Sequence, residues 1–283
     1  MLAGVGRSVV LENELVRAEL VPEQGGRLRS LYDRVGGREL LYARPGAAWD
    51  ADDYLATLAG GWDQMFPNDD PWHGLPTHGT LWSAELEVVE ASPGSAALRV
   101  DLPRPDLTVT HRYTLLEPPR RGVRLETEAN ARETLSGILW ATHPMLAVEP
   151  GWRIDPGTAA VDADANDPGR AAPGRLDAAT LDRVLTLPEP SLGWQEILYA
   201  PAAGVATVSS PEGTAATRVT WDREFFPWLW LVTLSGFVSV DLALVVEPCT
   251  TRPYRLDEAV AEGTAAQLVR GSTYRFWSCV EAV

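Results

Sequence analysis

The sequence predicts an all-β protein built as one large antiparallel β-sandwich, and three observations support this fold class. Many segments alternate apolar and polar residues with a period of two, which is the pattern of strands with one buried face. Turn-forming pairs of glycine and proline separate these segments, and the chain has 24 Gly and 22 Pro in 283 residues. Long helical segments do not alternate with the strands, so a doubly wound parallel sheet is not expected.

The predicted strands follow one another along the chain. In residues 15–20, Val16, Ala18 and Leu20 share one face, and in residues 273–280 the same holds for Tyr274 and Phe276. The apolar stretch 225–246 contains the pair Ser235-Gly236, and we interpret it as two buried strands joined by a turn there. The other alternating segments are residues 82–88, 106–116 and 122–128.

Two segments have a helical pattern, residues 50–58 and 175–185. The second lies within residues 149–190, which are rich in Ala, Pro, Gly and Asp. We interpret this stretch as a long insertion or lid, because strands resume on both sides of it without a change in composition. The sequence therefore predicts a single domain over residues 1–283.

Charge narrows the classes of partner. The chain has 39 acidic residues against 24 basic ones, all of them arginine, for a net charge of −15. Such a chain repels phosphate backbones and anionic lipid, so we expect no nucleic-acid or membrane partner, although solubility alone also explains the charge. The first residues lack the pattern of a secretory signal, and two cysteines make no disulfide framework. We therefore expect a cytoplasmic protein.

The four histidines differ in their surroundings. His111 is in phase with the apolar face of its segment and is expected in the core, whereas His73 lies in a turn-rich loop. His78 and His143 each sit at a predicted strand end beside Gly or Pro, where a sandwich presents side chains to a ligand. Cys-x-x-Cys, His-Glu-x-x-His and Gly-x-Ser-x-Gly patterns are absent, so neither a metal site nor a serine nucleophile is expected.

A carboxylate and the tryptophans complete the candidates. Glu247 ends the apolar run 238–246, where burial would raise its pKa toward that of a useful base; an exposed strand-end glutamate is the alternative. The chain has 11 Trp, whose flat faces fill cores or stack on sugar rings. The candidates for stacking are Trp62, Trp82, Trp194, Trp221, Trp228 and Trp230.

These pieces together resemble the aldose 1-epimerase, or galactose mutarotase-like, superfamily, over about residues 9–255. The matching segments are PEQGGRLRSLYDRVGGRELLY near the start, GGWDQMFPNDDPWHGLPTHGTLWSAELEV, the ATHPML segment around His143, and the late strands FFPWLWLVT and LALVVEPCT. The resemblance implies a mutarotase-like supersandwich fold and an enzyme that needs no cofactor.

The resemblance also implies roles for individual residues. Glu247 would be the general base on the anomeric hydroxyl, His143 the general acid on the ring oxygen, and His78 a hydrogen-bonding partner near that oxygen. Arg27 falls on a recurring arginine of the opening strand, with structural pairing to a carboxylate as its alternative. The candidate substrate-binding residues are Arg27, Asn68, Trp82, Trp194, Asp222 and Trp228.

The expected function is that of an aldose 1-epimerase, which interconverts the α and β anomers of a sugar by acid–base ring opening. The small-molecule partner is a free sugar or a sugar phosphate, since arginine pairs such as Arg252 and Arg255 suit a phosphate. There are two other hypotheses: a non-catalytic sugar-binding protein, and a domain that shapes the active site of a sugar-processing enzyme on another chain. The sequence is also compatible with a homodimer.

Overall fold

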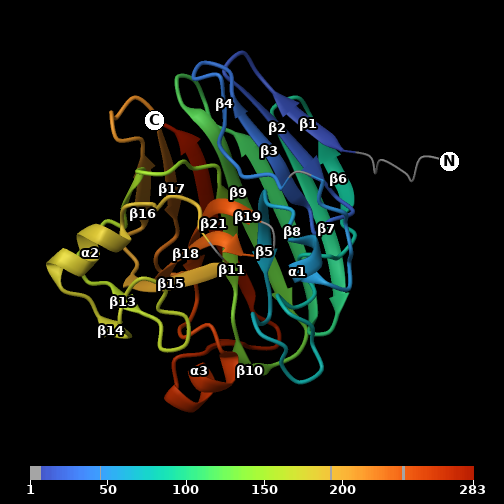
Figure 1. Cartoon of the computed structure of the whole chain (residues 1–283). Coiled ribbons are helices and arrows are strands. Elements are labelled where there is room, and N and C mark those ends of the chain that lie inside the picture. The colour runs from blue at the N-terminus through green and yellow to red at the C-terminus, as the bar shows by residue number, and fades with distance from the viewer. Residues whose placement is uncertain (1–7, 45, 192, 238–239) are drawn as a thin grey trace.

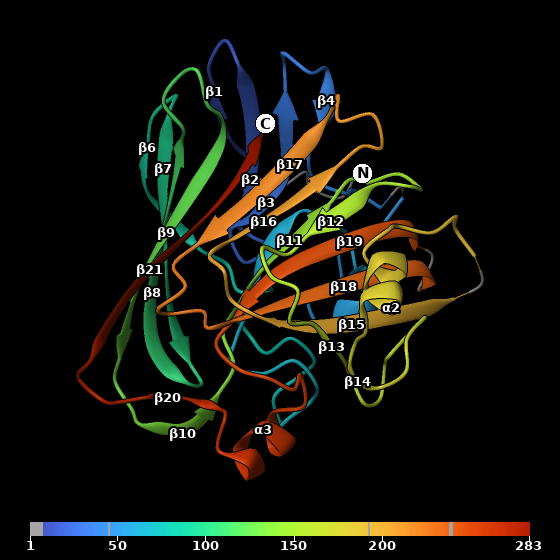
Figure 2. The same cartoon turned by 90° about the vertical axis from the view of Figure 1, so that its left-hand side faces the viewer.

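The protein, as a computed structural model that describes residues 8–44, 46–191, 193–237 and 240–283, consists of two large antiparallel sheets packed face to face (Figures 1 and 2). The first sheet has 11 strands and the second has 8. The all-β sandwich predicted from the alternating pattern is confirmed, since every pairing between named strands is antiparallel.

The first sheet carries the candidate residues. In spatial order its strands are β1 (Val9–Glu12), β2 (Val16–Val21), β3 (Arg27–Asp33), β5 (Trp62–Met65), β11 (Ala141–Leu146), β19 (Val240–Cys249), β18 (Trp228–Phe237), β15 (Trp194–Pro201), β13 (Asp162–Ala163) and β14 (Gly174–Arg175), with β4 (Arg38–Glu39) paired to β3.

The second sheet closes the other side of the core. Its order is β12 (Arg153–Asp155), β16 (Val205–Ser209), β17 (Ala216–Trp221), β21 (Thr273–Ala282), β9 (Arg121–Ala131), β8 (Asp106–Leu115), β7 (Ser95–Pro103) and β6 (Glu87–Ala91). A small third sheet pairs β10 (Leu135–Ile138) with β20 (Ala266–Leu268), and both views place helix α3 (Leu256–Glu262) beside it.

The main core lies between the two large sheets. Thr142 of β11 connects them, because its hydroxyl lies 3.1 Å from the Ser278 hydroxyl of β21 and accepts a 2.6 Å hydrogen bond from the Trp62 indole. His111 is fully buried as predicted, with Nδ1 2.9 Å from the Thr127 hydroxyl. Burial lowers the pKa of His111 to about 3, so this histidine is neutral and belongs to the core.

Two strand predictions need correction. Residues 82–86 form turns and irregular backbone instead of a strand. Their backbone hydrogen bonds go to the turn that follows β2, since the Leu86 N–H donates to the Pro22 carbonyl and the Ala84 carbonyl accepts from the Gly25 N–H. The pair Ser235-Gly236 lies inside β18, since the ladder with β19 continues through Ser235 opposite Leu242. The predicted turn there is wrong.

The helix predictions are confirmed with shorter bounds. Helix α1 (Tyr54–Thr57) begins after the Asp53 cap, and α2 (Ala178–Val184) begins after the Asp177 cap. Helix α3 lacks a side-chain cap and was not predicted. No helix within the described ranges is long and apolar enough to cross a membrane.

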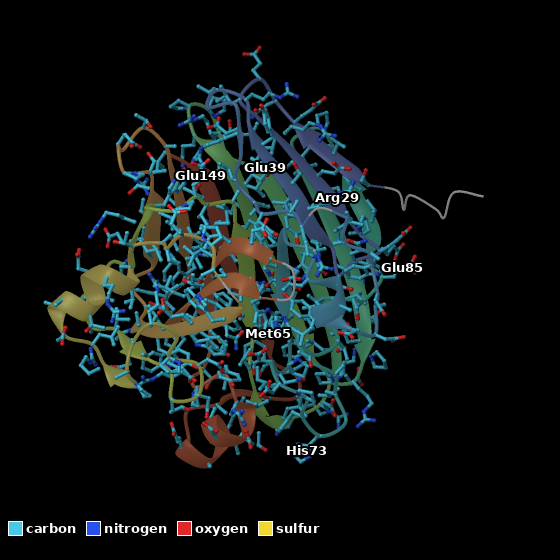
Figure 3. All side chains as sticks on the ribbon, viewed as in Figure 1. Arg29, Glu39, Met65, His73, Glu85 and Glu149 are labelled. Atoms are coloured by element: carbon cyan, nitrogen blue, oxygen red, sulfur yellow. The ribbon has the colours of Figure 1, made fainter. Side chains whose placement is uncertain are left out.

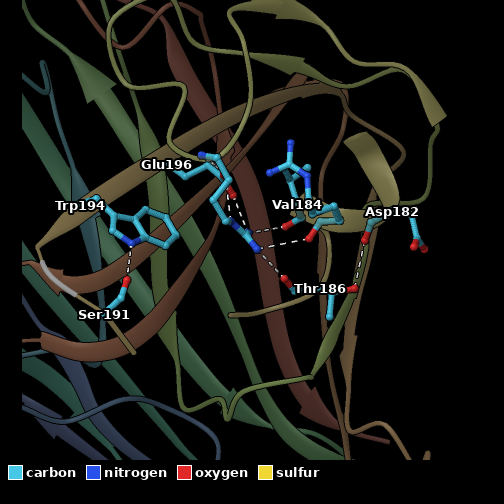
Figure 4. Close-up of polar contacts among 8 residues, drawn as sticks. Asp182, Val184, Thr186, Ser191, Trp194 and Glu196 are labelled. Atoms are coloured by element: carbon cyan, nitrogen blue, oxygen red, sulfur yellow. Dashed lines mark hydrogen bonds and ion pairs between the residues drawn. The ribbon is translucent and has the colours of Figure 1, made fainter. Parts of the chain in front are cut away.

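Residues 149–190, interpreted above as an insertion, supply β12 to the second sheet and β13 and β14 to the first. An ion pair between Arg170 and the buried Glu196 anchors this stretch (Figure 4). The Arg170 guanidinium lies 2.7 Å from Glu196 of β15 and also donates to the carbonyls of Val184 and Thr186 at the end of α2. Glu196 is fully buried. One arginine therefore satisfies the end of α2 and holds the insertion against the first sheet.

We expect Arg170→Ala to lower the free energy of unfolding by about 3–5 kcal/mol, because the buried Glu196 carboxylate loses its cationic partner and, among the described residues, keeps only the backbone N–H of residue 170. Arg153 is the matched control within the same insertion, since its pair with Asp182 is exposed on both sides. Arg153→Ala should change stability by less than about 1 kcal/mol. Urea denaturation followed by tryptophan fluorescence measures both, and equal effects would contradict the anchoring role.

Candidate active site

Four neighbouring strands bring one row of side chains to the face of the first sheet opposite the core. Asp63 of β5 is the cross-strand partner of His143 on β11, and Trp230 of β18 is the partner of Glu247 on β19. Between β11 and β19, Ala141 pairs with Cys249 and Met145 with Val245, which sets His143 opposite Glu247. Residues in one row of a sheet share a face, so these side chains are neighbours.

His143, Glu247 and Trp230 of this row line a cavity of about 190 Å³. The three residues expected to carry the chemistry, His78, His143 and Glu247, all line it. The remaining walls come from α1, the loop after β5, and strands β5, β11, β15, β18 and β19, with Tyr254 beyond β19. In Figure 3, Met65 of this wall lies within the molecule, whereas His73 lies at its margin, as expected for a loop histidine.

His143 is held from behind by two buried charges. Its Nδ1 lies 3.2 Å from one Asp63 oxygen, and the other Asp63 oxygen lies 3.0 Å from Arg27. Asp63 does not line the cavity, so the Nδ1 edge points away from it and Nε2 is the nitrogen left for a ligand. Burial raises the pKa of Asp63, but Arg27 and His143 outweigh this effect and hold the pKa at about 2. The carboxylate therefore stays ionised.

The protonation of His143 depends on its neighbours. Burial alone lowers the pKa of His143, but the negative charge of Glu247 and the contact with Asp63 outweigh it and raise the pKa to about 9. His143 therefore carries a proton at neutral pH and can donate it.

Glu247 is the complementary group. It is only 2% exposed, and its Oε1 has no hydrogen-bond partner among the described residues. Burial raises the pKa of Glu247 to about 8, although the positive charge of His143 opposes the shift. The burial and raised pKa expected from the apolar run are confirmed. The strand continues beyond Glu247 to Cys249, and His143 lies within β11, so neither residue sits at a strand end.

His78 enters the cavity from a loop. Its backbone has φ of 61°, an uncommon conformation for a residue with a side chain. Gly79 follows with φ of 69°, and a Cβ there would lie 2.0 Å from the Phe66 carbonyl oxygen, so the His-Gly pair requires glycine. His78 Nε2 lies 3.2 Å from Asp69, and the Tyr54 ring stacks on the imidazole with centroids 3.4 Å apart. Burial lowers the pKa of His78 although Asp69 opposes the shift.

Three other candidates support the site without lining its cavity. Arg27 pairs with Asp63, which is the structural alternative considered for it, and donates to the Gly60 carbonyl at 2.7 Å. Asn68 donates to the carbonyls of Asp70 and Pro76 and so fixes the loop that carries His78. Trp82 is buried, donates to Gly79 and meets Tyr54 edge to face at 5.1 Å.

The remaining candidates lie outside the cavity. Asp222 accepts hydrogen bonds from the backbone of Glu224 and Phe225 and closes a turn. Trp194 donates to Ser191, and Trp228 lies under the Arg252 guanidinium at 4.3 Å. Of the six tryptophans considered for stacking, only Trp230 lines the cavity. None of the described residues that line this cavity comes from residues 149–190.

Several residues of the site were not predicted. Tyr54, Asp69, Gln195 and Tyr254 line the cavity, and Asp63 stands behind His143. The capped helical pattern around residue 54 was the one available signal for Tyr54. The residues that the structure describes contain no group of three or more His, Cys, Asp or Glu side chains placed to hold a metal ion.

Comparison with known proteins identifies the fold. No family sequence profile matches the chain, and no curated protein sequence matches it. Among solved structures, the chain is similar to the Slr1438 protein from Synechocystis sp. PCC 6803, with a TM-score of 0.74 and 16% identity over 100% of this chain and 97% of that one.

Two further solved structures have a similar fold. A galactose mutarotase-like protein from Lactobacillus casei has a TM-score of 0.70 and 14% identity, over 98% of this chain and 100% of its own. A GalM/aldose epimerase homologue from C. elegans has a TM-score of 0.68 and 13% identity, over 99% of both chains. The chain therefore has the galactose mutarotase-like fold that its sequence motifs predicted.

Proposed function

We propose that the protein is an aldose 1-epimerase that interconverts the α and β anomers of a free monosaccharide. The observation that carries this proposal is the cross-strand placement of His143 opposite Glu247 in one small, largely buried cavity. Ring opening of a cyclic hemiacetal needs one group that accepts a proton and one that donates a proton, and this pair supplies both.

The proposed mechanism uses only these side chains. Glu247 takes the proton from the O1 hydroxyl, the O1 electrons form the C1=O1 double bond, and the C1–O5 bond breaks. His143 delivers its proton from Nε2 to O5, which becomes a hydroxyl group. Rotation about C1–C2 presents the other face of the aldehyde, and the reverse transfers close the ring and restore both residues. No cofactor enters this scheme.

Asp63 and Arg27, which lie behind His143, orient the imidazole and set its protonation in this proposal. The Asp63 carboxylate holds the proton on Nδ1 and orients the ring, and Arg27 keeps that carboxylate charged. His78, whose pKa burial lowers, is a neutral hydrogen-bonding group beside the ring oxygen in this proposal. Its Tyr54 and Asp69 contacts fix the plane of the imidazole.

The cavity favours a small uncharged ligand. Its volume of about 190 Å³ is below the range of about 300–1,000 Å³ that holds drug-sized ligands. The described lining residues include Asp69, Asp70 and Glu247 but no arginine, and the chain contains no lysine. The protonated His143 is the cation among these lining residues, and in this mechanism it is engaged with the ring oxygen. A phosphate group would therefore face the Asp69 and Asp70 side chains without an arginine or lysine, so a free sugar fits better than a sugar phosphate.

Glu247→Gln should reduce the rate of anomer exchange by at least about a hundredfold, because it removes a positioned base and keeps the shape of the side chain. NMR saturation transfer between the anomeric protons, across a panel of aldoses, measures the rate. Glu281→Gln is the control, since Glu281 is also buried but lies in the second sheet beside Arg120.

Circular dichroism checks that both variants fold. An unchanged rate in Glu247→Gln would exclude the proposed base. Sugar binding by the unaltered protein without any acceleration of exchange, for every sugar tested, would favour the non-catalytic binding protein.

The pH dependence follows from the two pKa values. Below pH 8, Glu247 holds a proton and cannot accept another, and above pH 9, His143 has lost the proton that it donates. We expect the rate, after subtraction of the buffer reaction, to rise as pH passes about 8 and to fall as it passes about 9. A rate that is highest at pH 6 and falls from there would contradict this assignment.

Asp63→Asn should move the falling limb of that profile to lower pH, because the lost carboxylate no longer raises the pKa of His143. The maximal rate should also fall, since the imidazole is no longer oriented. Asp33→Asn is a matched control, because Asp33 is an equally buried aspartate that pairs with Arg121 at 2.7 Å, outside the cavity. The double variant Arg27→Met with Asp63→Asn avoids an unpaired buried arginine if the single variant folds poorly.

A further inference from the structure

The cavity has two chemically different ends. Beyond the row of His143 and Glu247, the next residues on the same face of β11 and β19 are Met145 and Val245, which are cross-strand partners. Val232 of β18 pairs in turn with Val245. Met145, Val245 and Val232 therefore form an apolar row across β11, β19 and β18, two residues along each strand from the row of His143 and Glu247. All three side chains line the cavity.

The walls continue this apolar row. Leu234 and Phe237 extend it along β18, and Leu55 of α1 and Leu58, which follows this helix, contribute to the lining. Most of these residues pack into one apolar cluster with Tyr54 and Trp82. One polar side chain among the described lining residues lies in this region, that of Gln195, which is the cross-strand partner of Leu234.

The opposite end is rich in hydrogen-bonding groups. Asp69, Asp70, His78 and Tyr254 line the cavity there, beside the apolar side chains of Met65, Ile197 and Trp230. The Tyr254 hydroxyl itself donates to Asp167 at 3.0 Å and so has a fixed direction. A sugar therefore finds partners for its ring hydroxyls at this end and along the acid–base row.

We propose that the substrate is a 6-deoxyhexose, whose C5 carries a methyl group in place of hydroxymethyl, with that methyl group in the apolar end. This inference rests on the proposed function. His143 protonates the ring oxygen, and C5 is bonded to that oxygen, so a substituent on C5 is within reach of Met145, the next residue on this face of β11. A methyl group packs against the apolar row of Met145, Val232 and Val245, whereas the hydroxyl of a hydroxymethyl group held against these three side chains would lose its water and gain no partner from them.

The test compares sugars that differ only at C6. The pairs are D-fucose with D-galactose, 6-deoxy-D-glucose with D-glucose, and L-rhamnose with L-mannose, each followed by NMR saturation transfer on the full chain. In at least one pair we expect kcat/KM to favour the deoxy sugar by about 10- to 100-fold, the discrimination that a hydrophobic pocket gives for one such group.

A variant locates the preference. Val232→Thr places a hydroxyl in the apolar end at nearly constant volume, at a side chain that is only half-buried, and should reduce the ratio several-fold toward the parent hexose. Val269→Thr, exposed and outside the cavity, is the control and should leave the ratio unchanged.

The outcomes separate this inference from the function on which it rests. Acceleration of hexoses as fast as their deoxy partners, in every pair, overturns the deoxy-sugar inference and leaves the epimerase proposal standing. A deoxy preference that Val232→Thr does not alter also overturns it, because the apolar end would not be its source. No acceleration with any of the six sugars overturns both proposals.

Discussion

The buried charges that run from Arg27 through Asp63 to His143 are the constraint on which the site depends. Arg27 and Asp63 are each at most 3% exposed, and an isolated ion at such a depth would be very costly. Each group is tolerable only because the next one compensates it, and the Gly60 carbonyl takes a further guanidinium proton. Strands β3, β5 and β11 are therefore tied to one electrostatic arrangement, which ends at the imidazole that faces the cavity.

The same sheet builds both the core and the cavity, and the period of two keeps the two apart. Trp62 and Thr142 point toward the second sheet, while their neighbours Asp63 and His143 point the other way. A slip of one residue between β5 and β11 would exchange the two sets and bury the ion pair in the main core. The indole of Trp62, hydrogen-bonded to Thr142, opposes such a slip. Packing of the core thus fixes the register on which the chemistry depends.

Periodicity and turn composition were enough to predict the β-sandwich, because alternation is a local property. The three side chains that meet in the cavity were predicted as a set by the resemblance of their segments to the aldose 1-epimerase superfamily, since the strand-end positions expected for His143 and Glu247 were wrong. Asp63 could not be predicted, since its role exists only through a cross-strand register that a single sequence does not encode locally. The assignment of Trp194, Trp228 and Asp222 to the substrate failed to match the cavity for a related reason: their residue types suit a sugar, but their positions on β15, β18 and a turn direct them elsewhere. The turn expected at Ser235-Gly236 was wrong for a different reason. There a local turn preference was read correctly from the residue types, but the pairing of β18 with β19 overrides it.

The apolar end of the cavity links the strength of the base to the choice of ligand. Glu247 has a raised pKa chiefly because it is buried, and Val245, its neighbour on this face of β19, belongs to the apolar row that keeps water from it. A cavity with hydroxyl or amide groups in those positions would solvate the carboxylate and lower its pKa. The same side chains that make Glu247 a stronger base therefore offer nothing to a ligand hydroxyl. In the proposed mechanism, the basicity of Glu247 and the discrimination against a polar substituent on the sugar are two consequences of one desolvated surface.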